Sequence, residues 1–376
     1  MLWAVWRVMG VEILSAPGRH MFAGCCTPDG FQSHFEHILP IKKAKRIFII
    51  KGGPGTGKSS LMKRVARRMT DLGHKVEYIH CSSDPESLDG LVVPEAGIAM
   101  LDGTAPHVMD PVLPGVVDEI LYTGQFWNEQ ALIARRREVL EAGEGISGHY
   151  VRAIRYLRAA ASVMENATAP GPGGIDRRGL TGLADEICRG WLPVEPAEGT
   201  GIRRMFSSAV TPEGIVDFTP SLLKDTEMMT GLECRQGGLP ELLLARIADN
   251  ASNAGYDTEL FHAPFFPERI IMVVIPRLSM GFVAMNAWNR SGLTVSKSLD
   301  LDGYRILNQP DEKNFSVCIA RELSDKLLDM AVQAMVRAKS IHDRLESYYV
   351  PAMDMAALDA WAGDTVKKIE KWLPGG

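Results

Sequence analysis

The chain has 376 residues, of which 46% are hydrophobic and 23% are charged, and it carries a formal net charge of -5. This balance is typical of a soluble globular protein, and the length accommodates two domains of ordinary size. The negative net charge gives no electrostatic reason to expect a nucleic acid partner.

The first residues are apolar, but Arg7 and Glu12 interrupt them, and the run is too short to cross a membrane. No small-residue cleavage site follows a clean apolar core, which argues against a secretory signal. Whether residues 1–16 belong to the natural protein is left open, because Met9 could equally serve as its start. No other stretch has the length and apolarity of a membrane span, so we expect no membrane partner.

Cysteine usage favours a reducing compartment. The six cysteines show no C-x-x-C spacing, and the adjacent Cys25 and Cys26 cannot comfortably bridge each other. We therefore expect free thiols and a cytoplasmic protein.

A glycine-rich segment lies between a predicted strand and a predicted helix. The apolar run Arg46–Lys51 predicts the strand, apolar spacing over 58–72 predicts the helix, and the loop between them matches G-x-x-x-x-G-K-[ST]. Glycines let backbone N–H groups converge on phosphate oxygens, and the helix N-terminus adds N–H donors and a positive dipole. The expected nucleotide-binding residues are Gly53, Pro54, Gly55, Thr56, Gly57, Lys58, Ser59 and Ser60.

The chemistry of that loop predicts ATP and Mg²⁺ as ligands. Lys58 would reach the β- and γ-phosphates, and the Ser59 hydroxyl would ligate Mg²⁺. A second acid is expected at the end of a neighbouring strand, and the apolar run Gly97–Leu101 is followed directly by Asp102. We expect Asp102 to hold Mg²⁺ directly or through water, although an Asp-Gly pair after a strand is also a common turn.

Three acids after the second predicted strand, Lys75–His80, are candidates for a catalytic base. They are Asp84, Glu86 and Asp89. We expect them in a loop at the carboxyl ends of the strands, where α/β proteins bind ligands. Asp84 is placed among the catalytic residues with Lys58 and Asp102, while an ordinary turn role before a proline is equally compatible.

Apolar spacing also predicts helices elsewhere in the chain. One helical pattern follows the Thr-Pro-acid-Gly turn at 27–30 and has Phe31, Phe35, Ile38 and Leu39 on one side. Further helices are expected at 116–121, 129–142, 149–167 and 317–348. We expect these later helices to form an appended bundle, whereas alternating strands and helices predict a parallel sheet covered on both faces.

The chain also repeats itself. The stretch 19–30 recurs at 203–214, and Gly73, Glu77 and His80 recur at Gly255, Glu259 and His262. A register held through several landmarks predicts an internal duplication, with domains at 17–194 and 202–376. Pro- and Gly-containing stretches predict a loop at 169–174 and the linker between the domains at 195–201.

The second copy of the glycine loop lacks the residues that bind phosphate. The residues that align with Gly57, Lys58 and Ser59 are Leu239, Pro240 and Glu241. The leucine blocks close backbone approach, the proline removes an N–H donor, and the glutamate places negative charge where phosphate would lie. The strand that corresponds to the one before Asp102 ends in Asn286, with no acid at either plausible alignment. We therefore expect one ATP per chain.

Taken together, the motifs resemble a family of uncharacterised bacterial tandem P-loop proteins. The motifs are Arg-His-x-Phe and Thr-Pro-x-Gly within 19–30, the glycine loop at 51–59, His80-Cys81 with Asp84-Pro85, and Leu101–His107. The resemblance covers nearly the whole chain after the first residues. It implies a P-loop fold and an ATP site, and members are usually labelled ATPases or nucleotide kinases from the loop alone. This chain departs from members that keep a glycine loop in both halves.

The sequence therefore predicts an α/β protein of two tandem P-loop NTPase-type three-layer domains, with mainly parallel sheets and appended helices. We expect ATP hydrolysis or phosphoryl transfer to an unknown small-molecule acceptor, so an ATPase and a small-molecule or nucleotide kinase both stay open. The alternative is a nucleotide-gated switch with little turnover, whose second half docks a protein partner. Arg203 or Arg204 is a candidate to complete the nucleotide site. A homo-oligomer is also left open.

Overall fold

The computed structural model describes residues 16–168, 174–191, 201–234, 238–285, 293–306 and 312–373. The expectations for residues 1–15, 169–173, 195–200 and Asn286 fall outside these ranges.

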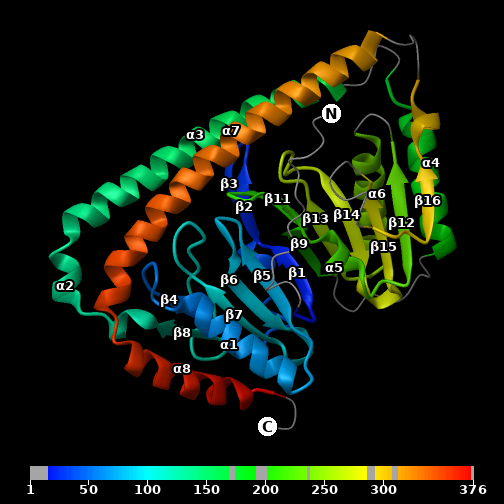
Figure 1. Ribbon diagram of the computed structural model, residues 1–376. Coiled ribbons are helices and arrows are strands. Elements are labelled where there is room, and N and C mark those ends of the chain that lie inside the picture. Colours follow the sequence, from blue (N-terminus) through cyan, green and yellow to red (C-terminus); the bar gives the residue numbers. More distant parts are fainter. Residues whose placement is uncertain are drawn as a thin grey trace.

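Twelve strands form one continuous sheet through the molecule (Figure 1). The first-half strands are β1 (Arg19–Phe22), β4 (Arg46–Lys51), β5 (Glu77–Cys81), β6 (Asp84–Val93), β7 (Ile98–Asp102) and β8 (Asp118–Tyr122). The second-half strands are β9 (Ile202–Phe206), β12 (Met228–Glu233), β13 (Thr258–His262), β14 (Ile270–Ile275), β15 (Met280–Ala284) and β16 (Lys297–Asp300). Two hairpins, β2 (Gly24–Thr27) with β3 (Gly30–Ser33) and β10 (Ser208–Thr211) with β11 (Gly214–Asp217), form separate small sheets.

The strand order is the same from either edge of the sheet. It runs β16-β12-β15-β14-β13-β9-β1-β5-β6-β7-β4-β8, so each first-half strand mirrors its second-half counterpart. β1 and β9 meet antiparallel at the centre, where Phe22 pairs with Phe206. The α/β class is confirmed, and the order is the one expected from a repeated chain. The boundaries at 194 and 202 stay a prediction, because both halves share this one sheet.

Strand directions within each half are mixed. β1–β5, β4–β7 and β4–β8 pair in parallel, whereas β6 runs antiparallel to both β5 and β7. The expected loop after the second strand is therefore wrong, because β6 already begins at Asp84. Cys81 pairs with Asp84 across a tight reversal, so the chain returns without a crossover helix.

Two predicted helices are strands or turns instead. The helix expected from Phe31 is wrong: β3 begins at Gly30 (φ +118°), which closes the β2–β3 hairpin, and only a short 3₁₀ turn, Phe35–His37, follows. The helix expected at 116–121 is β8, held by backbone pairing to β4. The buried Asp118 carboxylate also accepts the N–H groups of Val112 and Leu113, which ties the preceding loop to the strand.

Helices cover the sheet and span its two halves. They are α1 (Lys58–Asp71), α2 (Glu129–Ile133), α3 (Arg136–Thr168), α4 (Arg177–Trp191), α5 (Thr219–Leu223), α6 (Leu239–Asn253), α7 (Glu312–Tyr349) and α8 (Met355–Glu370). No helix among the described residues is long and apolar enough to cross a bilayer. All six cysteines lie among the described residues and none of them forms a disulfide, as expected from their spacing.

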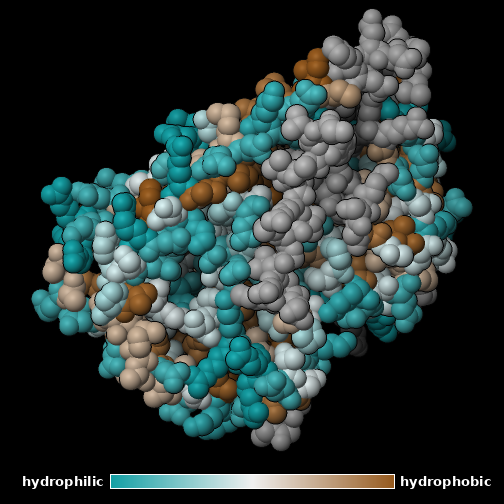
Figure 2. All heavy atoms as spheres, in the orientation of Figure 1, coloured by the Kyte–Doolittle hydropathy of each residue, from teal (hydrophilic) through white to brown (hydrophobic). Residues whose placement is uncertain are grey.

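The two longest helices, α3 and α7, lie side by side along one side of the molecule (Figure 1). Small residues let them approach closely, because Ala153 and Ala160 of α3 pack in one cluster with Ala331 and Ala334 of α7. Residues of both small hairpins join this cluster. The expected appended bundle is thus a helix pair that carries one helix from each half. Figure 2 shows the visible face as mostly hydrophilic, with hydrophobic residues in small separate groups.

The terminal helices of the two halves are exchanged. α4 belongs to the first half of the sequence, yet its Leu180, Ala184 and Ile187 pack in the cluster formed by α6. α8 belongs to the second half, yet its Val366 and Ile369 pack against the residues of α1. Each half of the sequence therefore completes the core of the other.

Four charged side chains, two buried glutamates and two largely buried arginines, lock the halves at the centre of the sheet. They are Arg19 of β1, Glu77 of β5, Arg203 of β9 and Glu259 of β13. Arg19 contacts both carboxylates, with Nη1 2.7 Å from Glu77 Oε1. Arg203 also contacts both, with Nη2 2.7 Å from Glu77 Oε2 and Nη1 3.1 Å from Glu259 Oε1. We call this set the Arg–Glu quartet.

Removing one charge from the quartet is expected to be strongly destabilising. Glu259→Gln leaves two buried guanidinium groups with one carboxylate, which should lower the free energy of unfolding by about 3–5 kcal/mol in chemical denaturation. Lys43→Gln is the matched control, because it breaks the exposed Lys43–Asp257 ion pair and should cost less than about 1 kcal/mol. Equal losses in the two variants would contradict the dominance of the quartet.

Candidate functional site

The glycine loop joins the end of β4 to the start of α1 in the expected manner. Gly55 (φ +64°) and Gly57 (φ +81°) adopt left-handed conformations that favour glycine, and Gly57 caps the helix that begins at Lys58. Thr56 is buried, and its hydroxyl donates to the Gly53 carbonyl (2.8 Å) and accepts from the Thr123 hydroxyl (3.0 Å). These hydrogen bonds stabilise the conformation of the loop. Pro54 lies within it, and Ser60 is exposed in the first turn of α1.

Lys58, Ser59 and Asp102 come together at the N-terminus of α1. The Lys58 ammonium donates to the carbonyls of Gly52 (3.2 Å) and Gly53 (2.8 Å) and lies 3.6 Å from Asp102 Oδ2. The Ser59 hydroxyl accepts the Leu88 N–H at 3.0 Å, which joins the helix to β6. Asp102 Oδ1 accepts the N–H and hydroxyl of Thr104, so Oδ2 is the oxygen that faces Lys58.

A further buried carboxyl group, Asp89, lies close to this group. His107 Nε2 is 3.4 Å from Asp89 Oδ2, and the Cys81 thiol also bonds to this carboxyl. Burial, followed by the negative charge of Asp102, raises the pKa of Asp89 to about 7. Burial lowers the pKa of His107 to about 4, which keeps that ring neutral. Asp89 is therefore an acid poised to exchange a proton near neutral pH.

The other two acids of the 82–89 segment lie elsewhere. Asp84 accepts the Ser87 hydroxyl (2.7 Å) and lies 3.8 Å from the Lys339 ammonium of α7. Glu86 is exposed. Asp84 therefore contacts α7, whereas Asp89 lies near enough to Asp102 for the charge of Asp102 to affect its pKa. The segment is strand β6 and not a loop, and its pairing to β5 shifts register between Ile79 and Cys81, so the three acids do not follow simple strand alternation.

Two residues that the sequence analysis did not single out also contact the site. The Lys51 ammonium donates to the carbonyls of Gly103 (2.8 Å) and Met109 (2.6 Å), and so holds the loop after β7. Glu346, near the end of α7, accepts the N–H of Gly55 at 3.1 Å. A helical pattern predicts a solvated glutamate at this position, so the sequence alone holds no signal for a contact nearly 300 residues away.

The second half differs at the same positions. The buried residues of α6 follow those of α1 in register, which aligns Ser59 with Glu241 as expected. The Glu241 carboxylate accepts the Gly238 N–H at 3.0 Å, so this helix N-terminus already holds an anion of its own. Ala284 pairs with Leu232 as Asp102 pairs with Ile50, so Ala284 is the position equivalent to Asp102; this corrects the expected Asn286 but again gives no acid.

Neither arginine expected to complete the nucleotide site lies beside the loop. Arg203 belongs to the Arg–Glu quartet. Arg204 donates toward His262 Nε2 at 3.1 Å. His262 and its first-half counterpart His80 each bond through Nδ1 to a proline carbonyl at 2.7 Å, which indicates the same structural role in both halves.

Comparison with known proteins gives one partial match. Residues 31–92 match the family model described as Nephrocystin 3, N-terminal. This segment includes the glycine loop and α1 but covers much less than half of the chain. No curated protein and no solved structure shows a significant match. The match does not indicate the bacterial tandem P-loop family, and that resemblance stays a proposal.

The raised pKa of Asp89 predicts a pH-dependent stability. The unfolded chain ionises this carboxyl near its ordinary value of 3.8, whereas the folded chain keeps it protonated to about 7. The folded state binds more protons between these values, so the contribution of Asp89 to stability falls as pH rises through this window. We expect the free energy of unfolding of the wild type minus that of Asp89→Asn to decrease over this window in urea denaturation. A difference that is constant with pH would contradict a raised pKa.

Proposed function

We propose that the chain is an ATP- and Mg²⁺-dependent P-loop NTPase with one nucleotide site, formed by the loop 53–60 of its first half. The observation that carries this proposal is the convergence at the N-terminus of α1, where Lys58 Nζ lies 3.6 Å from Asp102 Oδ2. A lysine at a helix N-terminus after a glycine loop is suited to hold a polyphosphate. Tandem P-loop architecture belongs to the same proposal, and the repeated strand order supports it.

The residues present fit the two ligands. Gly55 donates its N–H to a carboxylate oxygen, which is the kind of anionic acceptor that a phosphate would offer. Ser59 Oγ and Asp102 Oδ2 are the hard oxygen ligands that Mg²⁺ prefers. Bound Mg²⁺ would neutralise charge on the phosphates, while Lys58 and the loop N–H groups would stabilise the transferring phosphoryl group.

Asp89 is better placed than Asp84 to act as the general base. During transfer, the bond from the γ-phosphorus to the bridging oxygen breaks and a bond to the acceptor oxygen forms. The acceptor loses a proton in this step, and a carboxylate with a pKa near 7 is suited to take it. Asp84 was expected in this role, but its contacts are with Ser87 and Lys339. Water and a small-molecule hydroxyl are both compatible acceptors.

A nucleotide-gated switch with little turnover is the second candidate. The observation that favours it is the packing of α8 from the second half against α1 of the nucleotide site. The ion pairs Arg64–Asp359 (2.8 Å) and Arg68–Glu370 (2.5 Å) add to this contact. ATP at the loop would then change how the second half is held, and a protein partner could read that change.

Loss of the loop lysine is expected to abolish nucleotide binding. Lys58→Ala removes the ammonium that would contact the phosphates, and isothermal titration with MgATP should show at least a hundredfold loss of affinity, roughly the effect of removing a buried charge-assisted contact. The wild type should bind one ATP per chain. Wild-type affinity in Lys58→Ala, or two equivalent sites per chain, would contradict the proposal.

The two candidate bases are distinguished by their kinetics. We expect Asp89→Asn to lower kcat for phosphate or ADP release by roughly a hundredfold, the usual contribution of a general base, with little change in ATP affinity. Asp84→Asn is the matched control and should stay within about twofold, since Asp84 lies beside Lys339 instead. The reverse pattern would restore Asp84 as the base. Binding without turnover in the wild type would favour the switch.

A further inference from the structure

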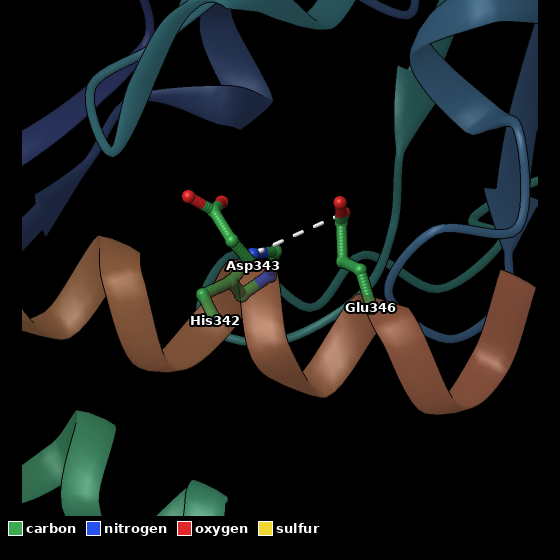
Figure 3. Close-up of side chains that lie close together, drawn as sticks. All are labelled: His342, Asp343 and Glu346. Atoms are coloured by element: carbon green, nitrogen blue, oxygen red, sulfur yellow. Dashed lines mark ion pairs between the residues drawn. The ribbon is translucent and has the colours of Figure 1, made fainter.

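The second half of the chain places an acid on the nucleotide loop. Glu346 Oε1 lies 3.1 Å from the Gly55 nitrogen, and this N–H is its hydrogen-bond donor. Figure 3 shows Asp343 and Glu346 projecting from α7 to the same side, with His342 Nδ1 3.9 Å from Glu346 Oε1. The glutamate reaches the loop from the last turn of α7.

The chain beyond Glu346 also packs on the loop. A Cβ added at Gly53 would lie 2.7 Å from the Tyr349 ring, and one at Gly55 would lie 2.9 Å from Val350. A Cβ at Gly57 would lie 3.0 Å from Leu358 of α8. The end of α7, the 3₁₀ turn η7 (Val350–Ala352) and the start of α8 thus form a continuous cover, residues 346–358, over the glycine loop.

The three side chains of Figure 3 do not make a metal site. The ligand atoms of His342, Asp343 and Glu346 lie within 4.8 Å of one another. However, Asp343 is paired with the Lys339 ammonium at 2.9 Å, and Glu346 accepts the Gly55 N–H. The side chains are also well exposed, so a cation would gain little over water.

A carboxylate and a phosphate cannot use the same loop donor. In a phosphate-binding loop the backbone N–H groups point inward at the phosphate oxygens, and Gly55 lies in the middle of that loop. Each N–H forms one good hydrogen bond, and two anions within reach of one donor repel each other. An incoming phosphate must therefore displace the Glu346 carboxylate.

We propose that Glu346 is a built-in competitor of ATP, which occupies the phosphate donor of Gly55 until nucleotide displaces it and loosens the cover formed by residues 346–358. This inference rests on the proposed function, because it concerns the regulation of the same site. It assigns the second half a role that does not require a nucleotide of its own.

The cover has contacts through which its displacement reaches the rest of the fold. The Asn128 N–H donates to the Ala352 carbonyl, and the Asp354 N–H donates to the Phe126 carbonyl, both at 2.7 Å. These bonds join residues 352–354 to residues 126–128, the segment that leads through α2 into α3. Loosening the cover therefore acts on both long helices, since α7 leads into it and α3 follows its partner segment.

Nucleotide affinity tests the competitor directly. We expect Glu346→Ala to bind MgATP about tenfold more tightly than the wild type in isothermal titration, because a charge-assisted hydrogen bond no longer has to be broken. Glu346→Gln keeps an acceptor but loses the charge and should lie between the two. Asp343→Asn is the matched control, because it removes the same charge one helical turn before Glu346, where the side chain makes no contact with the loop. Its affinity for MgATP should stay within about twofold of the wild type.

The outcomes separate this inference from the function on which it rests. If Glu346→Ala binds ATP with wild-type affinity or more weakly, and Lys58→Ala still abolishes binding, the competitor is wrong and the proposed function stands. If neither the wild type nor the Glu346 variants bind ATP, or if Lys58→Ala does not weaken binding, the proposed function is wrong. The inference about Glu346 is then wrong as well. An equal gain in Asp343→Asn would reduce the effect to general electrostatics and also overturn the competitor.

Hydrogen exchange tests the loosening of the cover. We expect MgATP to increase amide exchange in residues 346–358 of the wild type, and we expect Glu346→Ala to show increased exchange there without nucleotide. Residues of β5, at the centre of the sheet, serve as the internal reference and should not change. Exchange in the cover that ATP decreases or leaves unchanged would overturn the proposed displacement.

Discussion

The Arg–Glu quartet is the constraint on which the rest of the molecule depends. Two arginines and two glutamates are largely withdrawn from water, and each arginine forms an ion pair with a carboxylate of its own half and with one of the other half. Burial opposes the ionisation of Glu259, but Arg19 and Arg203 hold its pKa below the usual range. Such a group adds little stability over apolar packing, yet breaking it is costly. Planar guanidinium groups bind carboxylates in a fixed geometry, so the quartet also favours one angle between the halves.

That angle decides how the two halves can cooperate. β1 and β9 run antiparallel, and the pairings outward from each give β4 and β12 opposite directions. The carboxyl end of β4 and that of β12 therefore point to opposite sides of the sheet along the strand direction. The loop before α6 cannot reach the loop before α1. Any contribution of the second half to the glycine loop has to arrive through its helices. The exchanged α8 and the end of α7 provide that route.

Local patterns predicted the structure around the glycine loop, but they placed helices where β3 and β8 lie. The strand β4, the glycine loop and α1 follow from apolar spacing and from glycines at left-handed positions. The repeat correctly predicted which strands of the two halves correspond. Glu77 and Glu259 both contact Arg203, and His80 and His262 each bond to a proline carbonyl five residues later. The direction of β6 was not predictable from its composition, since buried apolar residues suit a parallel or an antiparallel neighbour equally. The contacts of Asp118 and Glu346 were not predictable either, because the backbone N–H groups that they accept are identified only in the folded chain.

The length of α7 gives the molecule a mechanical property. A helix of 38 residues extends over roughly 57 Å, which exceeds the width of most single domains. One end lies at the glycine loop, and the other lies over the second half of the sheet (Figure 1). The close packing of α3 along α7 stiffens the pair, so we expect its two ends to move together. The helix pair therefore connects the glycine loop mechanically to the second half of the molecule.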